Sequence, residues 1–246
     1  MSERKIGIIL QARVDSTRLP GKVLKPLAGK PMIQWIIERL QTSNNAQTLI
    51  LATSTLDQEA PLVDLAKKLH VEVFRGSESD VLDRYYQCAS AHGLDPIIRA
   101  TGDNPFIDSE ICDLLVDFYY REKLDYATVS TGPPNGYPLG IGVEVFSFAA
   151  LRKSWQEGHA LHHREHVNEY ILENPSLFKQ KKMEAPLSKR TPELSLTVDT
   201  IDQFKLAEQI YKNYLSQHPS SLVPVTWAID FLRGMSTGIP KGCQSK

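Results

Sequence analysis

The chain has 246 residues, 41% of them hydrophobic and 23% charged, which is ordinary for a globular protein and long enough for one domain with a sizeable core. The formal net charge of −1 provides no overall field that would attract nucleic acid or an anionic membrane. No apolar run approaches the roughly 20 residues of a membrane-spanning helix. The first apolar run is too short for a signal peptide and the cysteines lack paired spacing, so we expect a cytoplasmic protein.

Short apolar runs alternate with amphipathic segments over the first 146 residues. Strands are predicted at 5–10, 48–52, 71–74, 96–99, 126–129 and 142–146, and helices at 31–41, 58–69, 80–91 and 109–121. This alternation is typical of an α/β fold in which helices cover both faces of a mostly parallel sheet.

The pattern becomes less regular after residue 146. Helices are predicted at 147–156, 163–172, 202–215 and 222–232, with a polar stretch at 174–193 and a strand at 194–198. We expect a single domain over residues 1–235, in which 130–195 contribute substrate-binding and dimer elements, and a flexible tail at 236–246.

The loop at residues 11–22, QARVDSTRLPGK, places Arg13, Arg18 and Lys22 directly after the first predicted strand. In open α/β sheets, ligands bind beyond the carboxyl ends of the strands. A guanidinium is suited to phosphate oxygens, and a lysine beside a flexible glycine provides a compact charge. The loop therefore indicates either an anion site or a solvated basic surface, and its position after a buried strand favours the anion site.

Two further loops follow apolar runs and carry aspartates. Asp103 lies in RATGDNPFID, and Asp199 lies in LSLTVDTIDQF. Magnesium binds one or two protein carboxylates and completes its shell with water and phosphate, so these aspartates and the cationic loop would make a coherent magnesium–polyphosphate site. The alternative is that the aspartates cap the helices that follow. Capping is the better explanation for Asp108 and stays open for Asp199.

The opening segment, IILQARVDSTRLPGKVLKPLAGKPMIQWIIERL, closely resembles that of the cytidylyltransferases that activate acidic sugars as CMP derivatives. These include the 3-deoxy-manno-octulosonate and acylneuraminate enzymes. The motifs RGSESDVLDRYYQCA, RATGDNPFID, GIGVEVFSFAAL and REHVNEYI are similar to the branch named for spore-coat polysaccharide biosynthesis. The resemblance covers residues 5–235. It implies a Rossmann-like nucleotide-diphospho-sugar-transferase fold and a reaction in which CTP and a sugar acid give a CMP-sugar and pyrophosphate.

The resemblance also implies roles for individual residues. Arg13, Arg18 and Lys22 would grip the triphosphate as catalytic residues, and Asp103 and Asp199 would hold Mg²⁺. Relatives more often have VDTPED where this chain has VDTIDQ, a departure that leaves Asp199 in place. The residues expected to bind the nucleotide are Gln11, Ala12, Arg13, Ser77, Asp80, Arg84 and Asp103.

A sugar acid needs a cation or N–H groups for its carboxylate. The candidates are Arg99, Arg164, Asn135 and Tyr137. Asn135 and Tyr137 lie in the loop 131–140, which could equally be a plain connection. Apolar helix faces at 146–155 and 167–171 could bury a second subunit, and because relatives are commonly dimeric we expect a homodimer.

Three other functions remain as alternatives. The same fold hosts nucleotidylyltransferases that use another nucleotide or a neutral sugar phosphate, and also glycosyltransferases, although the usual DxD metal motif is absent. His162, Glu165 and His166 form an H-x-x-E-H pattern, which on one helix face could bind zinc in a metalloprotease. The same residues overlap the REHV element, so a polar helix face, a dimer contact or a substrate contact explains them as well.

Overall fold

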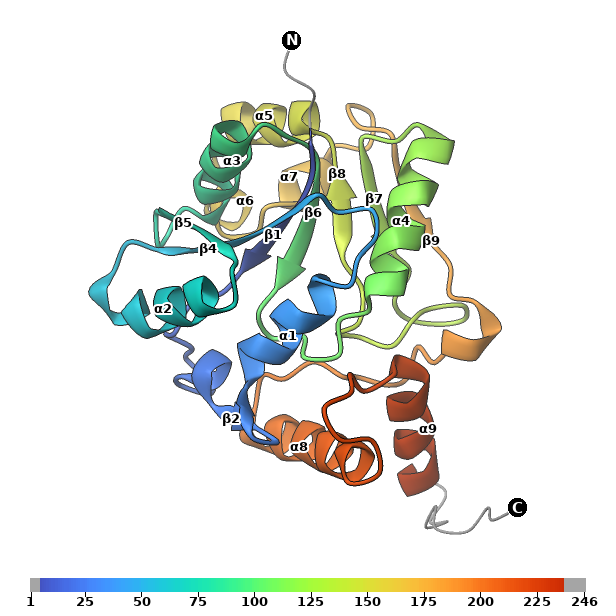
Figure 1. Ribbon diagram of the computed structural model, residues 1–246. Coiled ribbons are helices and arrows are strands. Elements are labelled where there is room, and N and C mark those ends of the chain that lie inside the picture. The colour runs from blue at the N-terminus through green and yellow to red at the C-terminus, as the bar shows by residue number, and fades with distance from the viewer. Residues whose placement is uncertain (1–4, 237–246) are drawn as a thin grey trace.

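The apolar run near the start of the chain forms β1 (Lys5–Gln11), an interior strand of a seven-stranded sheet (Figure 1). The computed structural model describes residues 5–236. The strand order is β5-β4-β1-β6-β8-β7-β9. The other strands are β4 (Thr48–Ser54), β5 (Glu72–Gly76), β6 (Leu94–Thr101), β7 (Tyr126–Val129), β8 (Glu144–Phe146) and β9 (Gln180–Met183).

Helices cover both faces of this sheet, as the alternating pattern predicts (Figure 1). Successive side chains of a strand point to opposite faces, so Ile8 and Leu10 join one core cluster while Ile9 joins the other. The first cluster includes residues of α1 (Met32–Leu40), α2 (Ala60–Lys68), α4 (Ser109–Glu122), α8 (Ile201–Leu215) and α9 (Val225–Ser236). The second includes residues of α3 (Val81–His92), α5 (Phe148–Glu157) and α7 (Glu169–Glu173).

The sheet is mostly parallel, which confirms the predicted fold class. Only β8 runs antiparallel to its neighbours β6 and β7 within residues 5–236. Gln11 at the end of β1 pairs in register with Ala52 of β4 and Thr101 of β6. The carboxyl ends of these three strands therefore lie side by side, and the loops that follow β1 and β6 meet at one edge of the sheet.

Three predictions about local structure are wrong. The stretch 194–198 is no strand, because Ser195 forms only an isolated bridge to Leu139, and its apolar pattern reflects the burial of Leu196 and Val198 in the first core cluster. The predicted helix at 163–172 is two short helices, α6 (Leu161–Glu165) and α7, separated by a turn. The polar stretch at 174–193 contains β9, an edge strand whose partly polar sequence suits its position.

The apolar helix faces proposed for a dimer are used within this chain. Ala150, Leu151, Val167 and Ile171 are all buried in the second core cluster, so these faces are not left for a partner.

The short pair β2 (Pro26–Leu27) and β3 (Lys30–Pro31) was not predicted; it is a hairpin whose turn residues both have positive φ. Residues 237–246 of the predicted tail lie outside the described residues.

Candidate nucleotide-binding cleft

A cleft of about 840 Å³ opens where the loops after β1 and β6 meet α3, α6 and the segment before α8. Most of the residues predicted from the sequence line it. From β1 and its loop come Gln11, Ala12, Arg13, Arg18 and Lys22; from β6 and its loop, Arg99 and Asp103; from the other segments, Asp80, Arg84, Arg164 and Asp199. The cleft therefore lies at the carboxyl ends of the parallel strands, as expected for this fold class.

The cationic loop is folded back on itself and anchored beneath the cleft. Gly21 has a φ of 68°, a left-handed conformation that glycine adopts without strain, and its N–H donates to Val14 O at 3.1 Å. Val14 N–H in turn donates to a carboxylate oxygen of Glu59 at 2.9 Å. Glu59 is buried and also accepts from the Thr53 hydroxyl at 3.0 Å. This anchor fixes the path of the loop, and it could not be predicted from the sequence.

Lys22 is the buried cation of this loop, whereas Arg13 and Arg18 are exposed. Its ammonium group contacts Asp199 Oδ1 at 2.9 Å and donates to Val198 O at 2.8 Å. Arg18 Nη2 also lies 2.9 Å from Asp199 Oδ1. Two cations thus converge on one carboxylate oxygen, and they join the loop after β1 to the start of α8.

Asp199 is held by the end of helix α8. Thr200 and Gln203 form a capping box at this end, and the Gln203 side chain accepts from Asp199 N–H at 2.7 Å. The sequence left open whether Asp199 caps the helix or serves the site. Thr200 is the N-cap, so Asp199 precedes the cap, and its carboxylate contacts the cations of the cleft.

Asp103 lies across from Asp199 in the loop after β6. Its carboxylate accepts from the Thr101 hydroxyl at 2.5 Å, and its carbonyl accepts from Val198 N–H at 2.8 Å. Gly102, the residue before Asp103, contacts the loop after β1: its N–H donates to Gln11 O at 2.8 Å, and a Cβ added at this glycine would lie 2.8 Å from Ala12 Cβ. Glycine at this position therefore permits the close approach of the two loops that carry the site. Asp108 caps α4, as predicted.

Asp80 and Arg164 form a charged pair across the opposite wall of the cleft. Asp80 caps α3 with one oxygen, and its other oxygen accepts from Arg164 Nη2 at 2.6 Å and Nε at 2.9 Å. Arg84 is buried behind them and donates to Ser77 O at 2.6 Å; burial lowers its pKa. Ser77, which was expected to bind the nucleotide, does not line the cleft; its Oγ accepts from Asp80 N–H at 3.0 Å.

Arg99 forms a partly buried ion pair in the cleft. Arg99 Nη1 lies 2.7 Å from Glu144 Oε2, while Glu144 Oε1 accepts from Tyr126 OH at 2.8 Å and from Asn168 Nδ2 at 2.7 Å. Burial alone would lower the pKa of Arg99, but the Glu144 carboxylate raises it above its ordinary value. Within the described residues, the buried Nε of Arg99 has no hydrogen-bond partner.

The sequence model of the family described as cytidylyltransferase matches residues 7–222. The chain belongs to the cytidylyltransferase family. It is 36% identical over 213 residues to the spore coat polysaccharide biosynthesis protein SpsF of Bacillus subtilis, with 84% of this chain and 86% of that protein covered. Over 133 residues it is 34% identical to the 3-deoxy-manno-octulosonate cytidylyltransferase of Synechococcus elongatus, with 52% of each chain covered.

A solved cytidylyltransferase structure from Leptospira borgpetersenii has the same fold throughout. It matches with a TM-score of 0.86 at 29% identity, and the match covers 99% of this chain and 100% of that one. These findings confirm the family resemblance drawn from the opening segment. They also confirm that this cytidylyltransferase is an enzyme with the expected nucleotidyltransferase fold.

Two residues predicted to bind the acceptor lie outside the cleft of this cytidylyltransferase. Tyr137 is buried at 1% exposure, and its backbone N–H donates to Ser130 O at 2.8 Å. The Asn135 side chain donates to Glu184 at 3.3 Å. The loop 131–140 therefore packs beside β7 and β9, which matches its alternative interpretation as a connection.

The H-x-x-E-H pattern does not form one helix face. Helix α6 ends at Glu165, and His166 has an extended conformation with φ −116° and ψ 108°. Glu165 and His166 line the cleft, whereas His162 contacts Glu173. The three-residue zinc site predicted for a protease is therefore absent, and the contribution of α6 to the cleft fits the REHV element of the family.

The charges that line the cleft balance. The cations are Arg13, Arg18, Lys22, Arg84, Arg99 and Arg164, and the carboxylates are Asp15, Glu78, Asp80, Asp103, Glu165 and Asp199. Without a ligand the carboxylates neutralise the cations, so a strongly anionic ligand must displace some of these pairs or arrive with cations of its own.

Among the helices of residues 5–236, none is both long and apolar enough to cross a bilayer.

Proposed function

We propose that this cytidylyltransferase transfers CMP from CTP to a hydroxyl group of an acidic sugar of the octulosonate or nonulosonate type, releasing pyrophosphate. The observation that carries the proposal is the convergence of Arg18 and Lys22 on Asp199 at the carboxyl ends of the central strands. A triphosphate is the ligand that would exchange with this carboxylate, because it brings several anionic oxygens that can accept from both cations at once.

The carboxylates of the cleft suit Mg²⁺. Asp103 and Asp199 provide hard oxygen ligands beside a loop built for phosphate, and Mg²⁺ prefers one or two such carboxylates together with phosphate oxygens. Asp199 Oδ1 is engaged by cations that the triphosphate would draw away, which would free it for the ion. When bound, Mg²⁺ would neutralise charge on the phosphates and align the reacting oxygens.

The proposed step is an in-line displacement at the α-phosphorus. The sugar hydroxyl gives its proton to solvent water and forms the new P–O bond, while the bond to pyrophosphate breaks and its electron pair leaves with the β-phosphate oxygen. Negative charge grows on that oxygen. Lys22 is buried and also donates to Val198 O, so its ammonium group would stay beside the leaving oxygen after the triphosphate has displaced Asp199, with little reorganisation during the reaction.

Arg99 is the residue proposed to bind the acceptor carboxylate. It lines the cleft with 17% of its side chain exposed, and its contact with Glu144 uses Nη1. Arg164 is held by Asp80 through both Nη2 and Nε, so it is the second choice. The names of the two curated relatives, a spore coat polysaccharide protein and a 3-deoxy-manno-octulosonate enzyme, support an acidic sugar destined for a surface polysaccharide.

The test is pyrophosphate release with MgCl₂, each of the four nucleoside triphosphates and a panel of sugar acids of the octulosonate, neuraminate, pseudaminate and legionaminate types. We expect release with CTP and one acid, and its loss in Asp103→Asn. Release with a different nucleotide, or with a neutral sugar phosphate, would contradict the proposed substrates and support a nucleotidylyltransferase of other specificity. No release, together with no binding of Mg²⁺ and CTP by calorimetry, would contradict the proposal entirely.

A further inference from the structure

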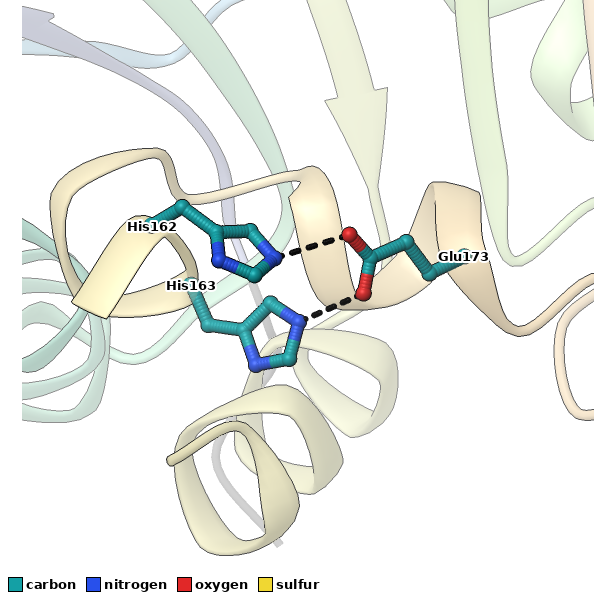
Figure 2. Close-up of side chains that lie close together, drawn as sticks. All are labelled: His162, His163 and Glu173. Carbon is teal, nitrogen blue, oxygen red and sulfur yellow. Dashed lines mark hydrogen bonds and ion pairs between the residues drawn. The ribbon is translucent and has the colours of Figure 1, made fainter. Parts of the chain in front are cut away.

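Three metal-ligating side chains meet outside the nucleotide cleft. His162 and His163 lie on α6, and Glu173 lies at the end of α7 (Figure 2). His162 Nε2 is 2.8 Å from Glu173 Oε1, and His163 Nε2 is 2.7 Å from Glu173 Oε2. Both imidazoles thus direct the same ring nitrogen at one carboxylate, and the ligand atoms of the three groups all lie within 4.8 Å of one another.

We propose that His162, His163 and Glu173 bind a single divalent transition-metal ion of the Zn²⁺ type. Two imidazole nitrogens and one carboxylate are a donor set that zinc uses with three protein ligands, leaving a fourth position for water. Imidazole nitrogens disfavour Mg²⁺, so this site would be chemically distinct from the aspartates of the cleft. It also differs from the H-x-x-E-H pattern, since only His162 belongs to both groups.

The burial of the three side chains suits an ion that enters from solvent. His163 is buried, whereas the side chains of His162 and Glu173 are 50% and 47% exposed. Zinc–ligand bonds near 2.0–2.2 Å place neighbouring ligand atoms roughly 3.3 Å apart, somewhat further than the hydrogen bonds seen here. The exposed pair can make this small adjustment around a fixed His163. Within the described residues, His163 Nδ1 has no partner, so the ring is oriented by Glu173 and by its contacts with the rings of His162 and Tyr170.

An ion at this site would brace one wall of the cleft. The next residue of α6, Arg164, holds Asp80 through two contacts of 2.6 and 2.9 Å, and Leu161, Glu165 and His166 line the cleft. Helix α6 has only five residues, and short helices are marginal without tertiary support. A metal bridge from α6 to α7 would therefore hold the wall in place. This inference concerns the metal alone and does not depend on which nucleotide or sugar is used.

The first experiment measures Zn²⁺ binding to the untagged, chelator-stripped full chain by calorimetry, with Co²⁺ absorption spectra as a report on coordination. We expect one ion per chain, with affinity at least about tenfold lower in His162→Ala and Glu173→Gln. His159→Ala is the matched control, because this exposed histidine precedes α6 and is not in the cluster, and it should bind as the wild type does. Circular dichroism of each variant verifies that it is folded.

Two results would overturn the proposal. The first is that the wild-type chain fails to bind Zn²⁺ at micromolar concentration. The second is that His162→Ala and Glu173→Gln retain wild-type affinity, which would place the ion elsewhere. Hydrogen exchange of residues 158–174 tests the bracing role. Exchange should slow on adding Zn²⁺ to the wild type and to His159→Ala but not to His162→Ala, and unchanged exchange in the zinc-bound wild type would refute that role.

Discussion

Replacing Lys22 with methionine tests the role proposed for the cationic loop. The substitution keeps the length of the side chain but removes the charge that contacts Asp199 at 2.9 Å. If Lys22 stabilises the departing pyrophosphate, its loss resembles the removal of one preorganised donor, which costs about 3–4 kcal/mol of barrier. At 1.36 kcal/mol for each factor of ten, kcat should fall by about a hundred- to a thousandfold.

The assay is pyrophosphate release at saturating CTP and acceptor, with binding of CTP measured separately by calorimetry. Lys25→Met is the matched control, since Lys25 lies on the same loop but outside the cleft, with its ammonium 5.9 Å from the Phe204 ring centroid. The control should retain activity within about twofold. Lys22→Met also leaves Val198 O without its donor, so we expect a loss of about 1–2 kcal/mol in the free energy of unfolding.

The pattern of kinetic constants decides the interpretation. A kcat within threefold of the wild type, with CTP affinity unchanged, would reduce Lys22 to a structural link between its loop and α8. A weaker CTP affinity with unchanged kcat would show uniform binding of substrate and transition state, which also contradicts a role at the leaving group. Assays run well below the thermal midpoint of the variant separate either outcome from unfolding.

Three further changes have defined outcomes. Glu144→Gln leaves the partly buried Arg99 charge without its carboxylate and should lower the free energy of unfolding by about 2 kcal/mol in urea titrations, and an unchanged midpoint would contradict the ion pair. Partial burial raises the pKa of Asp113, but hydrogen bonds from Ser43 and Asn44 lower it overall, so Asp113→Asn should cost about 1–2 kcal/mol at pH 7. The pKa of Asp113 in the folded protein lies below the ordinary 3.8, so the stability difference between the wild type and Asp113→Asn should persist down to about pH 3.8 and disappear as the pH falls through the folded pKa. A difference in unfolding free energy that stays constant with pH would contradict this role of Asp113. Removing divalent ions with EDTA should abolish pyrophosphate release, and added Mg²⁺ should restore it, whereas activity that persists in EDTA would contradict the magnesium proposal.

The sequence predicted the central fold well because its signals are local. Buried parallel strands are short apolar runs, and the helices between them begin at residues that suit a first turn, so β1, β4 and β6 could be placed within a few residues. The cleft followed from the rule for carboxyl ends of strands. Apart from the hairpin β2–β3, the errors fall after residue 146, where tertiary contacts decide the structure: the apolar pattern at 194–198 reflects burial of Leu196 and Val198 in the first core cluster, and β9 forms by pairing with β7.

The supporting residues of the site carried no sequence signal. Glu59 is a buried carboxylate that holds Val14 and Thr53, yet in the sequence it is one acidic residue at the start of a helix. Glu144 likewise reads as a polar residue in a strand, and only the fold shows that it pairs with Arg99. The meeting of His162 with Glu173 depends on the turn between α6 and α7, which the predicted single helix would have removed.

The balance of charge in the cleft explains how a chain with a net charge of −1 can serve a highly charged substrate. Arg18 and Lys22 already contact Asp199, and the cleft as a whole is lined by as many carboxylates as cations. Repulsion between the cations is therefore offset before a ligand binds. A triphosphate adds several negative charges at once, and the cleft lacks a surplus of cations to offset them. Binding should therefore depend on Mg²⁺ more steeply than it would in a strongly basic site, and lowering the ionic strength should not replace the ion.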